Sequence, residues 1–282
     1  MNCWKSDIDL EHPCWNGYRE LLERLPGESF PGTETLSAEL TQGICSRHGA
    51  PIRFQPAASL PGVDYERHIF ETGEVSTREQ NWHDLFNALV WCRLPRLKVA
   101  MNALHYEHLD LSHGGQRGRL RDALTLLDES GIIVAGSNID LLNALANRDW
   151  HAAFVTHRAS WAEETRVMVC GHAILEKFLQ PYKSITAHAL LLHTPSVMSR
   201  GDIDRLLGSS LSNPRWLQSP AMLSPLPLMG IPGWWGAGEQ NRDFYDDQDV
   251  FRPLSGRRSP APVFVPGETW PMTDPGHLQI QS

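Results

Sequence analysis

The sequence predicts an α+β fold that is predominantly helical: a buried antiparallel helical hairpin, a small β-hairpin sheet, and a loop-rich C-terminal aromatic wrap. Three observations predict it. Residues 81–109 form the densest run of apolar and aromatic side chains, residues 120–137 hold two apolar runs around the turn-rich letters DESG, and 11 of the 20 prolines lie beyond Asn213. We expect one domain, 1–282, with an irregular N-terminal segment (1–60), a core (61–212) and the Pro- and Trp-rich wrap (213–282).

Composition places the chain among soluble globular proteins, with 41% apolar and 21% charged residues in 282. No apolar run approaches the roughly 18–20 residues needed to cross a bilayer, and the N-terminal letters MNCWKSDIDLEHPC contain no apolar signal core. The five cysteines form no CxxC pair, which favours reduced thiols and a cytoplasmic location. The formal charge of −8 argues against general attraction to nucleic acid.

Before the hairpin we expect a short helix at Asn16–Leu25 followed by a proline-punctuated segment. Cys45 and His48 have a C-x2-H spacing, but no second half of a zinc site follows, so an incidental reading is favoured.

The hairpin is predicted from its caps and its turn. Asn81 is a good N-cap and Asp84 at position N3 suits a variant of the capping box, so a helix begins here. It is apolar nearly all round, which is typical of a buried helix. Pro95 fits the first turn of a second helix, so Leu94 is the turning point of an antiparallel pair.

Four polar side chains fall at matching distances from that turn. His83 and His105 are each 11 residues from Leu94, and Asn87 and Asn102 are 7 and 8 residues from it. In a straight hairpin the two histidines face each other, with the two asparagines one turn nearer the loop.

Downstream, HGGQRGRLR (113–121) is a glycine-rich basic loop, and LRDALTLLDESGIIVAGS predicts two strands joined at Asp128–Gly131. Helices are expected at Ile139–Asn147, Trp150–Glu163 and Asp202–Leu211. The segment Arg166–Leu179 suits a helix whose start could be a strand, and Ala187–His193 is a buried strand or a short helix. In the wrap, the aromatic residues need burial; packing is favoured over a base-stacking role for the Trp234–Trp235 pair.

Several segments in order resemble one family. NWHDLFNALVW with PRLKVAMNALH, then RDALTLLDESG, GHAILEK and PGWWGAGEQNRDFYDDQDVFRP are similar to the bacterial domain of unknown function 3025 (DUF3025) over roughly residues 60–255. The resemblance implies a cytosolic bacterial protein and no particular activity, so function has to be argued from the residues.

Nine of the 13 histidines fall between His83 and His193, which indicates a site in the central segment. Imidazoles and carboxylates are ligands for zinc, manganese or iron. We expect a divalent metal ion at His83, His105 and His172, with a carboxylate ligand or general base among Asp84, Asp122 and Glu176. His172 and Glu176 have the i, i+4 spacing that makes neighbours on a helix. The alternative is a hydrogen-bonded core network in which the histidines are structural.

Arginines Arg117, Arg119 and Arg121 follow the glycine-rich letters, and guanidinium groups bind oxyanions. This is not a Walker loop, because the Gly-Lys-Ser/Thr ending is missing. Solvated surface arginines are the alternative. With Asn87 and Asn102 as further substrate contacts, the leading hypothesis is a metal-dependent hydrolase acting on a small-molecule or phosphorylated substrate such as a phosphoester. The rival is a non-catalytic ligand- or partner-binding protein. Oligomeric state is left open.

Overall fold

The computed structural model describes residues 4–57, 64–109, 115–211, 216–236, 238–256 and 258–266, the side chains of 115–117 excepted. Within these residues the α+β fold class is confirmed. The helices are α1 (Arg19–Arg24), α2 (Thr33–Ala38), α3 (Tyr65–Thr72), α4 (Trp82–Arg93), α5 (Pro95–Glu107), α6 (Gly115–Ser130), α7 (Ile139–Asn147), α8 (Ser160–Glu163), α9 (His172–Lys177) and α10 (Arg200–Ser210). The strands are β1 (Arg53–Pro56), β2 (Glu74–Thr77), β3 (Gly131–Gly136), β4 (Thr165–Val169), β5 (Thr186–His193), β6 (Ser224–Pro227) and β7 (Val263–Phe264).

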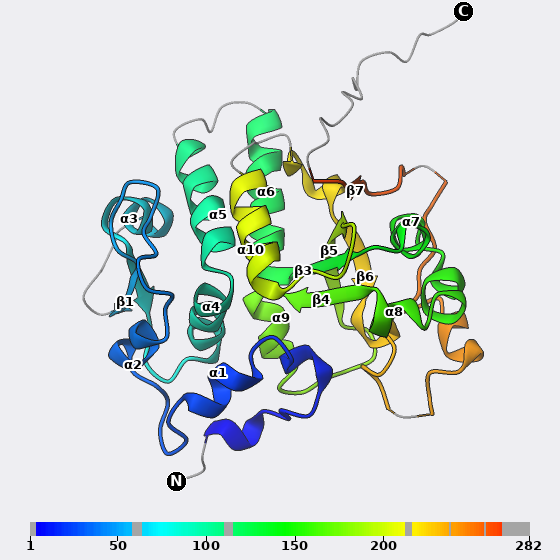
Figure 1. Cartoon of the computed structure of the whole chain (residues 1–282), viewed down its shortest axis with the longest axis horizontal. Coiled ribbons are helices and arrows are strands. Elements are labelled where there is room, and N and C mark those ends of the chain that lie inside the picture. Colours follow the sequence, from blue (N-terminus) through cyan, green and yellow to red (C-terminus); the bar gives the residue numbers. More distant parts are fainter. Residues whose placement is uncertain are drawn as a thin grey trace, which may run out of the picture.

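The main sheet is mixed, with strand order β4-β3-β5-β6 and with β7 paired to β5. β3 and β5 are parallel neighbours, whereas β4 and β6 run antiparallel to the strands they flank. Every residue of β3 is buried, as is usual for a central strand covered on both faces. β1 and β2 form a separate parallel pair, and Figure 1 shows this pair and the main sheet on opposite sides of α5.

The two helices joined at Leu94 form as expected, but their antiparallel pairing is not confirmed. Asn81 caps α4 by accepting from the Asp84 N–H at 3.0 Å, and Pro95 opens α5. However, α4 packs chiefly against α9, while α5 packs against α10 and α3. In Figure 1, α5 extends upward beside α6 and α10, and α4 lies below it. The expected pairing of His83 with His105 depended on the hairpin geometry.

The predicted β-hairpin at 120–137 is wrong in its first half. Residues up to Ser130 form helix α6, and only Gly131–Gly136 is a strand. The buried residues of α6 are Leu120, Ala123, Leu124 and Leu127, which is the i, i+3, i+4, i+7 spacing of one helix face. The antiparallel partner of β3 is β4, which comes after α7 and α8.

Other predicted elements agree more closely with the observed helices and strands. α1, α7 and α10 lie within or close to the expected helices, and Ala187–His193 is a strand. Residues 150–163 hold a π-helical turn, Ala152–Thr156, and the short α8. Arg166–Leu179 divides into β4 and α9. The N-terminal segment contains more regular structure than expected, including β1 and α2.

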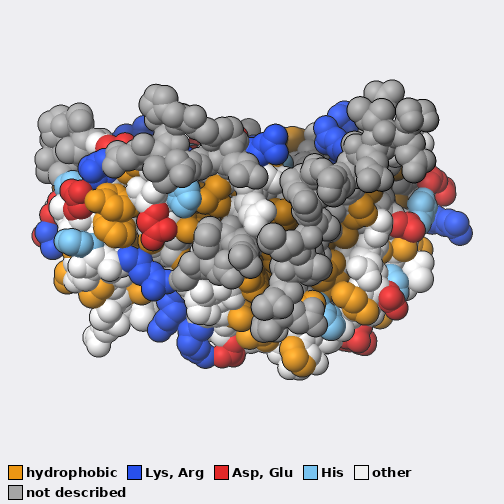
Figure 2. Space-filling model, turned by 90° about the horizontal axis from the view of Figure 1, so that it is seen from above, with side chains coloured by type: hydrophobic (Ala, Val, Ile, Leu, Met, Phe, Trp, Pro, Cys, Tyr) orange, Lys and Arg blue, Asp and Glu red, His pale blue; other side chains and the backbone are white. Residues whose placement is uncertain are grey.

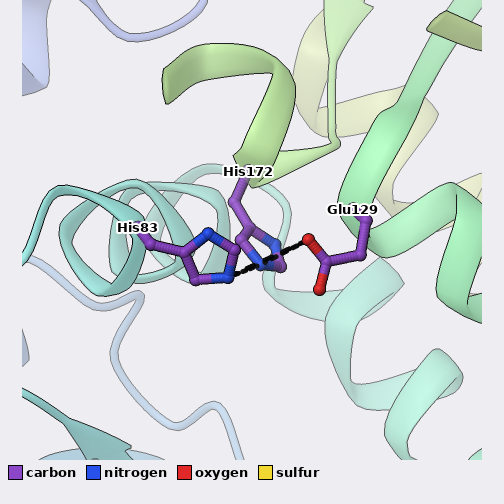
Figure 3. Close-up of side chains that lie close together, drawn as sticks. All are labelled: His83, Glu129 and His172. Atoms are coloured by element: carbon purple, nitrogen blue, oxygen red, sulfur yellow. Dashed lines mark hydrogen bonds and ion pairs between the residues drawn. The ribbon is translucent and has the colours of Figure 1, made fainter. Parts of the chain in front are cut away.

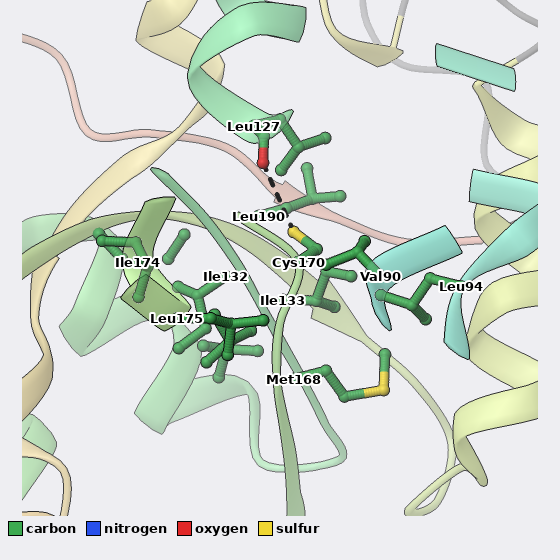
Figure 4. Close-up of a cluster of buried hydrophobic side chains, with 14 of the residues drawn as sticks. Val90, Leu94, Leu127, Ile132, Ile133, Met168, Cys170, Ile174, Leu175 and Leu190 are labelled. Atoms are coloured by element: carbon green, nitrogen blue, oxygen red, sulfur yellow. Dashed lines mark hydrogen bonds between the residues drawn. The ribbon is translucent and has the colours of Figure 1, made fainter. Parts of the chain in front are cut away.

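One apolar core joins the elements that carry the polar residues discussed below. Figure 4 shows its centre, where side chains from α4, α6, β3, β4, α9 and β5 meet. The Cys170 thiol donates to the Leu127 carbonyl at 3.7 Å and ties the end of α6 to the end of β4. Part of the expected wrap also packs on this core: Trp234, Tyr245 and Phe251 are buried. The ends of α6 and β4 are therefore held firmly side by side.

The visible surface carries charges of both signs. Figure 2 shows acidic, basic and histidine side chains interspersed among apolar ones on the face it presents, with the visible basic groups in short runs and no broad patch. Among the described residues, no helix combines the length and the apolar character that crossing a membrane requires.

Candidate metal centre

Three elements meet where the N-terminus of α4 approaches the C-terminus of α6. His83 lies in the first turn of α4, Glu129 is the last residue but one of α6, and His172 is the first residue of α9. Because α4 packs along α9 and α6 also contacts α9, these three positions converge. They are called the outer cluster below.

Gly171 makes the approach possible. A Cβ atom at this position would lie 2.3 Å from the Gly131 nitrogen and 2.7 Å from the Glu129 carbonyl oxygen, distances that no side chain tolerates. The Gly171 N–H donates to the Gly131 carbonyl at 2.8 Å. The absence of a side chain thus lets the turn before α9 touch the turn after α6, and it places His172 beside Glu129.

The donor atoms of the outer cluster face one another, as Figure 3 shows. Nε2 of His172 lies 2.9 Å from Nε2 of His83 and 3.4 Å from Oε2 of Glu129. Nε2 of His83 lies 3.9 Å from the same carboxylate oxygen. A point equidistant from these three atoms is about 2.0 Å from each, which is the length of a zinc–imidazole or zinc–carboxylate bond. Among the described residues, His83, Glu129 and His172 are the group of three or more His, Cys, Asp or Glu side chains whose donor atoms lie close enough together to hold a metal ion.

The second nitrogen of each histidine faces a carboxylate. Nδ1 of His83 lies 3.2 Å from Oε2 of Glu176, at the i+4 position from His172. Nδ1 of His172 faces Asp128, whose Oδ2 is 4.0 Å away. A carboxylate on the far nitrogen of a metal-binding histidine orients the ring and leaves the other nitrogen free as a ligand. The His83 ring has that arrangement, whereas the 4.0 Å between Nδ1 of His172 and Oδ2 of Asp128 is too long for a direct hydrogen bond.

Electrostatics favour a cation at this position. Burial lowers the pKa of His172 to about 4, so its ring is neutral at pH 7 and can serve as a ligand. Burial also raises the pKa of the Glu129 carboxyl; the His83 ring opposes the rise, and the charges of Asp128 and Glu176 add to it. A divalent ion between the rings and Glu129 would offset this excess of negative charge.

A second group of polar residues lies behind the first and is called the inner cluster: Glu66, Lys98, His105 and Asp128. These side chains, with Tyr65 and Asn102, line an empty space of about 230 Å³, part of it open to solvent. Lys98 Nζ lies 2.5 Å from Asp128 Oδ1 and 2.9 Å from Asn87 Oδ1. Asp128 therefore belongs to the inner cluster while also facing His172 of the outer cluster.

The inner cluster is strongly perturbed by burial. Burial lowers the pKa of His105 to about 4 and raises the pKa of Glu66 to about 7. Burial alone would raise the pKa of Asp128, but the Lys98 ammonium, together with His172 and His105, lowers it. The Asp128 carboxyl is thus ionised at pH 7, and His105 is neutral.

The structure brings together His83 and His172 among the predicted metal ligands and places Glu176 against His83. His105 instead lines the inner cavity. Asp84 is engaged elsewhere: its carboxylate accepts from the Arg78 backbone N–H at 2.6 Å and from the Arg78 guanidinium. The expected return bond of Asp84 to Asn81 is therefore replaced by a bond to Arg78.

The remaining predicted site residues lie away from the outer cluster. Asp122 is exposed on α6, seven residues or about 10 Å along the helix axis from Glu129. Arg119 is exposed and Arg121 half-buried, at still greater distances along α6, while the Arg117 side chain lies outside the described residues. Asn87 donates to the Tyr65 hydroxyl at 2.9 Å, and Asn102 donates to Oε2 of Glu66 at 2.7 Å. Both asparagines serve the inner cluster.

Sequence reasoning missed Glu129, Asp128 and Lys98. The first two were assigned to the turn of a β-hairpin, where polar residues need no further explanation. The helical spacing of Leu120, Leu124 and Leu127 was the signal that could have extended α6 and placed both carboxylates at its C-terminal end. No pattern in the sequence singles out Lys98, because its partner is 30 residues away.

The chain matches the family described as "Protein of unknown function (DUF3025)" over residues 52–255, and it therefore belongs to that family. The match includes all three residues of the outer cluster and all four of the inner cluster. No curated protein and no solved structure matches the chain.

Proposed function

We propose that this protein is a metal-dependent hydrolase whose divalent ion is held by His83, Glu129 and His172. The observation that carries the proposal is the convergence of three donor atoms, from three separate helices, at metal-bonding distance from one point. Zinc, manganese and iron all accept this donor set.

Three protein ligands leave room for water and substrate. Catalytic zinc sites commonly have three protein ligands and an open position, whereas structural sites have four. The side chains of His83 and Glu129 are 34% and 41% exposed, so a substrate can reach the open side. A bound divalent ion lowers the pKa of water to about 7 and supplies a nucleophile at neutral pH. Hydrolysis is the simplest reaction for such a centre.

The surrounding residues have positioning roles in this proposal. Glu176 contacts Nδ1 of His83, the nitrogen that faces away from the ion, which fits orientation of the ring better than direct ligation. Asp128 places its negative charge 4.0 Å from Nδ1 of His172, and Lys98 holds Asp128 in place. Each ring therefore presents Nε2, the nitrogen that the ion needs.

A phosphoester substrate is the finer part of the proposal and needs a cation near the ion. Arg119 and Arg121 lie too far along α6 to reach a group bound beside Glu129. Arg78 is better placed, because it pairs with Asp84 one residue from His83 and interacts electrostatically with Glu176. The Arg78 side chain is 59% exposed, so its guanidinium can turn toward an anion.

The test compares hydrolysis of p-nitrophenyl phosphate, bis-p-nitrophenyl phosphate and p-nitrophenyl acetate by protein loaded with zinc, manganese or iron. We expect turnover that chelation abolishes, that returning the ion restores, and that His172→Ala and Glu129→Gln each reduce by at least about 100-fold. Arg78→Gln should raise KM for the phosphate substrates only. Metal binding without turnover of any ester would contradict the hydrolase assignment.

The second candidate is a non-catalytic protein in which the histidine pair is structural. One observation favours it: the distance of 2.9 Å between Nε2 of His83 and Nε2 of His172 is also that of a hydrogen bond between two neutral rings. This candidate predicts that His83→Ala lowers the melting temperature equally with and without chelator. The metal proposal predicts a loss confined to the metal-loaded protein.

A further inference from the structure

A second pocket lies between the end of α4, the start of α10 and the outer edge of β4. Its lining includes Tyr18, Arg93, Leu94, Val169, Arg200 and Trp234, around a small space that is partly open to solvent. None of these residues belongs to the outer or inner cluster. The walls are largely apolar apart from the two arginines.

Both arginine side chains are held by hydrogen bonds to backbone carbonyls beside the pocket. Arg93 Nε donates to the Gly17 carbonyl at 2.7 Å, and Arg200 Nη1 donates to the Arg93 carbonyl at 2.9 Å. These bonds fix the side chains and occupy only some of the five N–H groups on each. The carboxylate that contacts Arg93 belongs to Glu20, whose side chain is 77% exposed. Water therefore screens the attraction between the two charges, and Glu20 offsets the positive charge of Arg93 only weakly. Burial, followed by the charge of Arg93, lowers the pKa of Arg200.

The edge of β4 adds backbone N–H and C=O groups. β4 is the outer strand of the described sheet. The N–H of Cys170 donates to the Gly131 carbonyl, and the N–H of Ser137 donates to the Glu164 carbonyl. Alternation along an antiparallel pair then directs the backbone groups of Val167 and Val169 away from β3, toward the pocket. The Val169 carbonyl confirms that direction, since it accepts from the Tyr18 hydroxyl at 2.5 Å.

We propose that Arg93, Arg200 and this edge of β4 form a binding site for an oxyanion, a carboxylate or a phosphate group. Two guanidinium groups and the outward backbone of β4 border a partly open space with largely apolar walls, where charge-assisted hydrogen bonds are stronger than in bulk water. An anion there offsets the repulsion between the two arginines. The site is independent of the metal centre and does not rest on the hydrolase proposal.

The experiment measures binding of inorganic phosphate and of acetate by calorimetry, with sodium chloride keeping the ionic strength constant. We expect saturable binding of one anion per chain. Binding of phosphate alone would assign a phosphate site, and binding of acetate alone would assign a carboxylate site. His83→Ala should bind the anion as the wild type does, which separates this pocket from any anion held at the metal centre.

Arginine variants locate the site. Arg200→Gln should weaken binding at least about tenfold, the effect of losing one charge-assisted bond. Arg200→Lys keeps the positive charge but loses the forked guanidinium. Its affinity for the anion should lie between those of the wild type and Arg200→Gln. The matched control is Arg205→Gln on the same helix, whose side chain is 59% exposed and pairs with Asp202; it should leave binding unchanged. The proposal is overturned if neither anion binds above the chloride control, or if Arg200→Gln and Arg205→Gln bind alike.

Discussion

The outer and inner clusters share an edge at Asp128 but differ in how their polar groups are satisfied. In the inner cluster, Lys98 and Asp128 are buried against each other and Asn102 bonds to Glu66. In the outer cluster, two ring nitrogens and a carboxylate oxygen face a common point, and the side chains of His83 and Glu129 are partly exposed. A group whose members satisfy one another supports the fold, whereas a group whose acceptors face a common point is suited to a ligand. Substitutions in the two clusters should therefore have different consequences.

The largest effect is expected in the inner cluster. Lys98→Met leaves the Asp128 carboxylate buried without its cation, which typically costs roughly 3–5 kcal/mol of folding free energy. Urea denaturation of the metal-free protein measures it. Lys177→Met, an exposed lysine on α9, is the matched control and should change the free energy of unfolding by less than about 0.5 kcal/mol. Equal behaviour of the two variants would remove the distinction between the clusters.

His83→Ala should show the opposite pattern. We expect at least about a 100-fold loss of zinc affinity, with less than about 1 kcal/mol lost from the metal-free protein, because the ring is partly exposed and alanine suits a helix. Zinc titration against a competing chelator, together with urea denaturation, provides both numbers. His151→Ala, at a partly exposed histidine paired with Asp246, is the control and should retain full affinity. Unchanged affinity in His83→Ala would count against the outer cluster as a metal site.

The pH dependence of stability probes the buried titratable groups of both clusters. His172 and His105 have pKa values of about 4 in the fold against 6.5 as the reference, so each favours unfolding as the pH falls from 6.5 toward 4. Glu66 acts in the other direction. Its folded pKa of about 7 exceeds the reference of 4.5, so its contribution to stability is full below 4.5 and is lost as the pH rises through 7.

Glu66→Gln removes that opposing contribution. The variant should therefore lose more stability than the wild type between pH 7 and pH 5, by about 2 kcal/mol. Chemical denaturation of metal-free protein at the two pH values measures the difference. The same slope in both proteins would mean that Glu66 titrates as an ordinary surface carboxylate.

The smallest effect is expected at Asp122. Its exposed position on α6 predicts that Asp122→Asn changes zinc affinity by less than twofold and stability by less than about 0.5 kcal/mol. Glu129→Gln, near the end of the same helix, is the comparison and should lose at least about 100-fold in affinity. If Asp122→Asn weakened zinc binding as Glu129→Gln does, the ligand set would have to be redrawn.

The sequence predicted the elements whose signals are local. Asn81, Leu94 and Pro95 set the bounds of two helices, and the fold class followed from the balance of helical and strand patterns. The direction in which two helices pack is not local. It depends on partners such as Asp204, which comes from α10 and accepts from the Leu97 N–H at the start of α5.

The site was predicted only in part, because some of its residues have local signals in the sequence and others depend on contacts between distant segments. His83 and His172 stood out as histidines in a central apolar segment, and the spacing of His172 and Glu176 indicated a helix face. Glu129 could be found only after α6 was recognised as a helix. The contact that places it beside His172 depends on Gly171, whose role is visible only once two turns far apart in the chain touch.

The most direct test of the central claim is the metal content and metal affinity of protein purified without a histidine tag. The account predicts about one divalent ion per chain in the wild type, bound or taken up on addition, and less than a tenth of that in a variant carrying both His83→Ala and His172→Ala. A wild-type protein that neither contains nor takes up zinc, manganese or iron would contradict it.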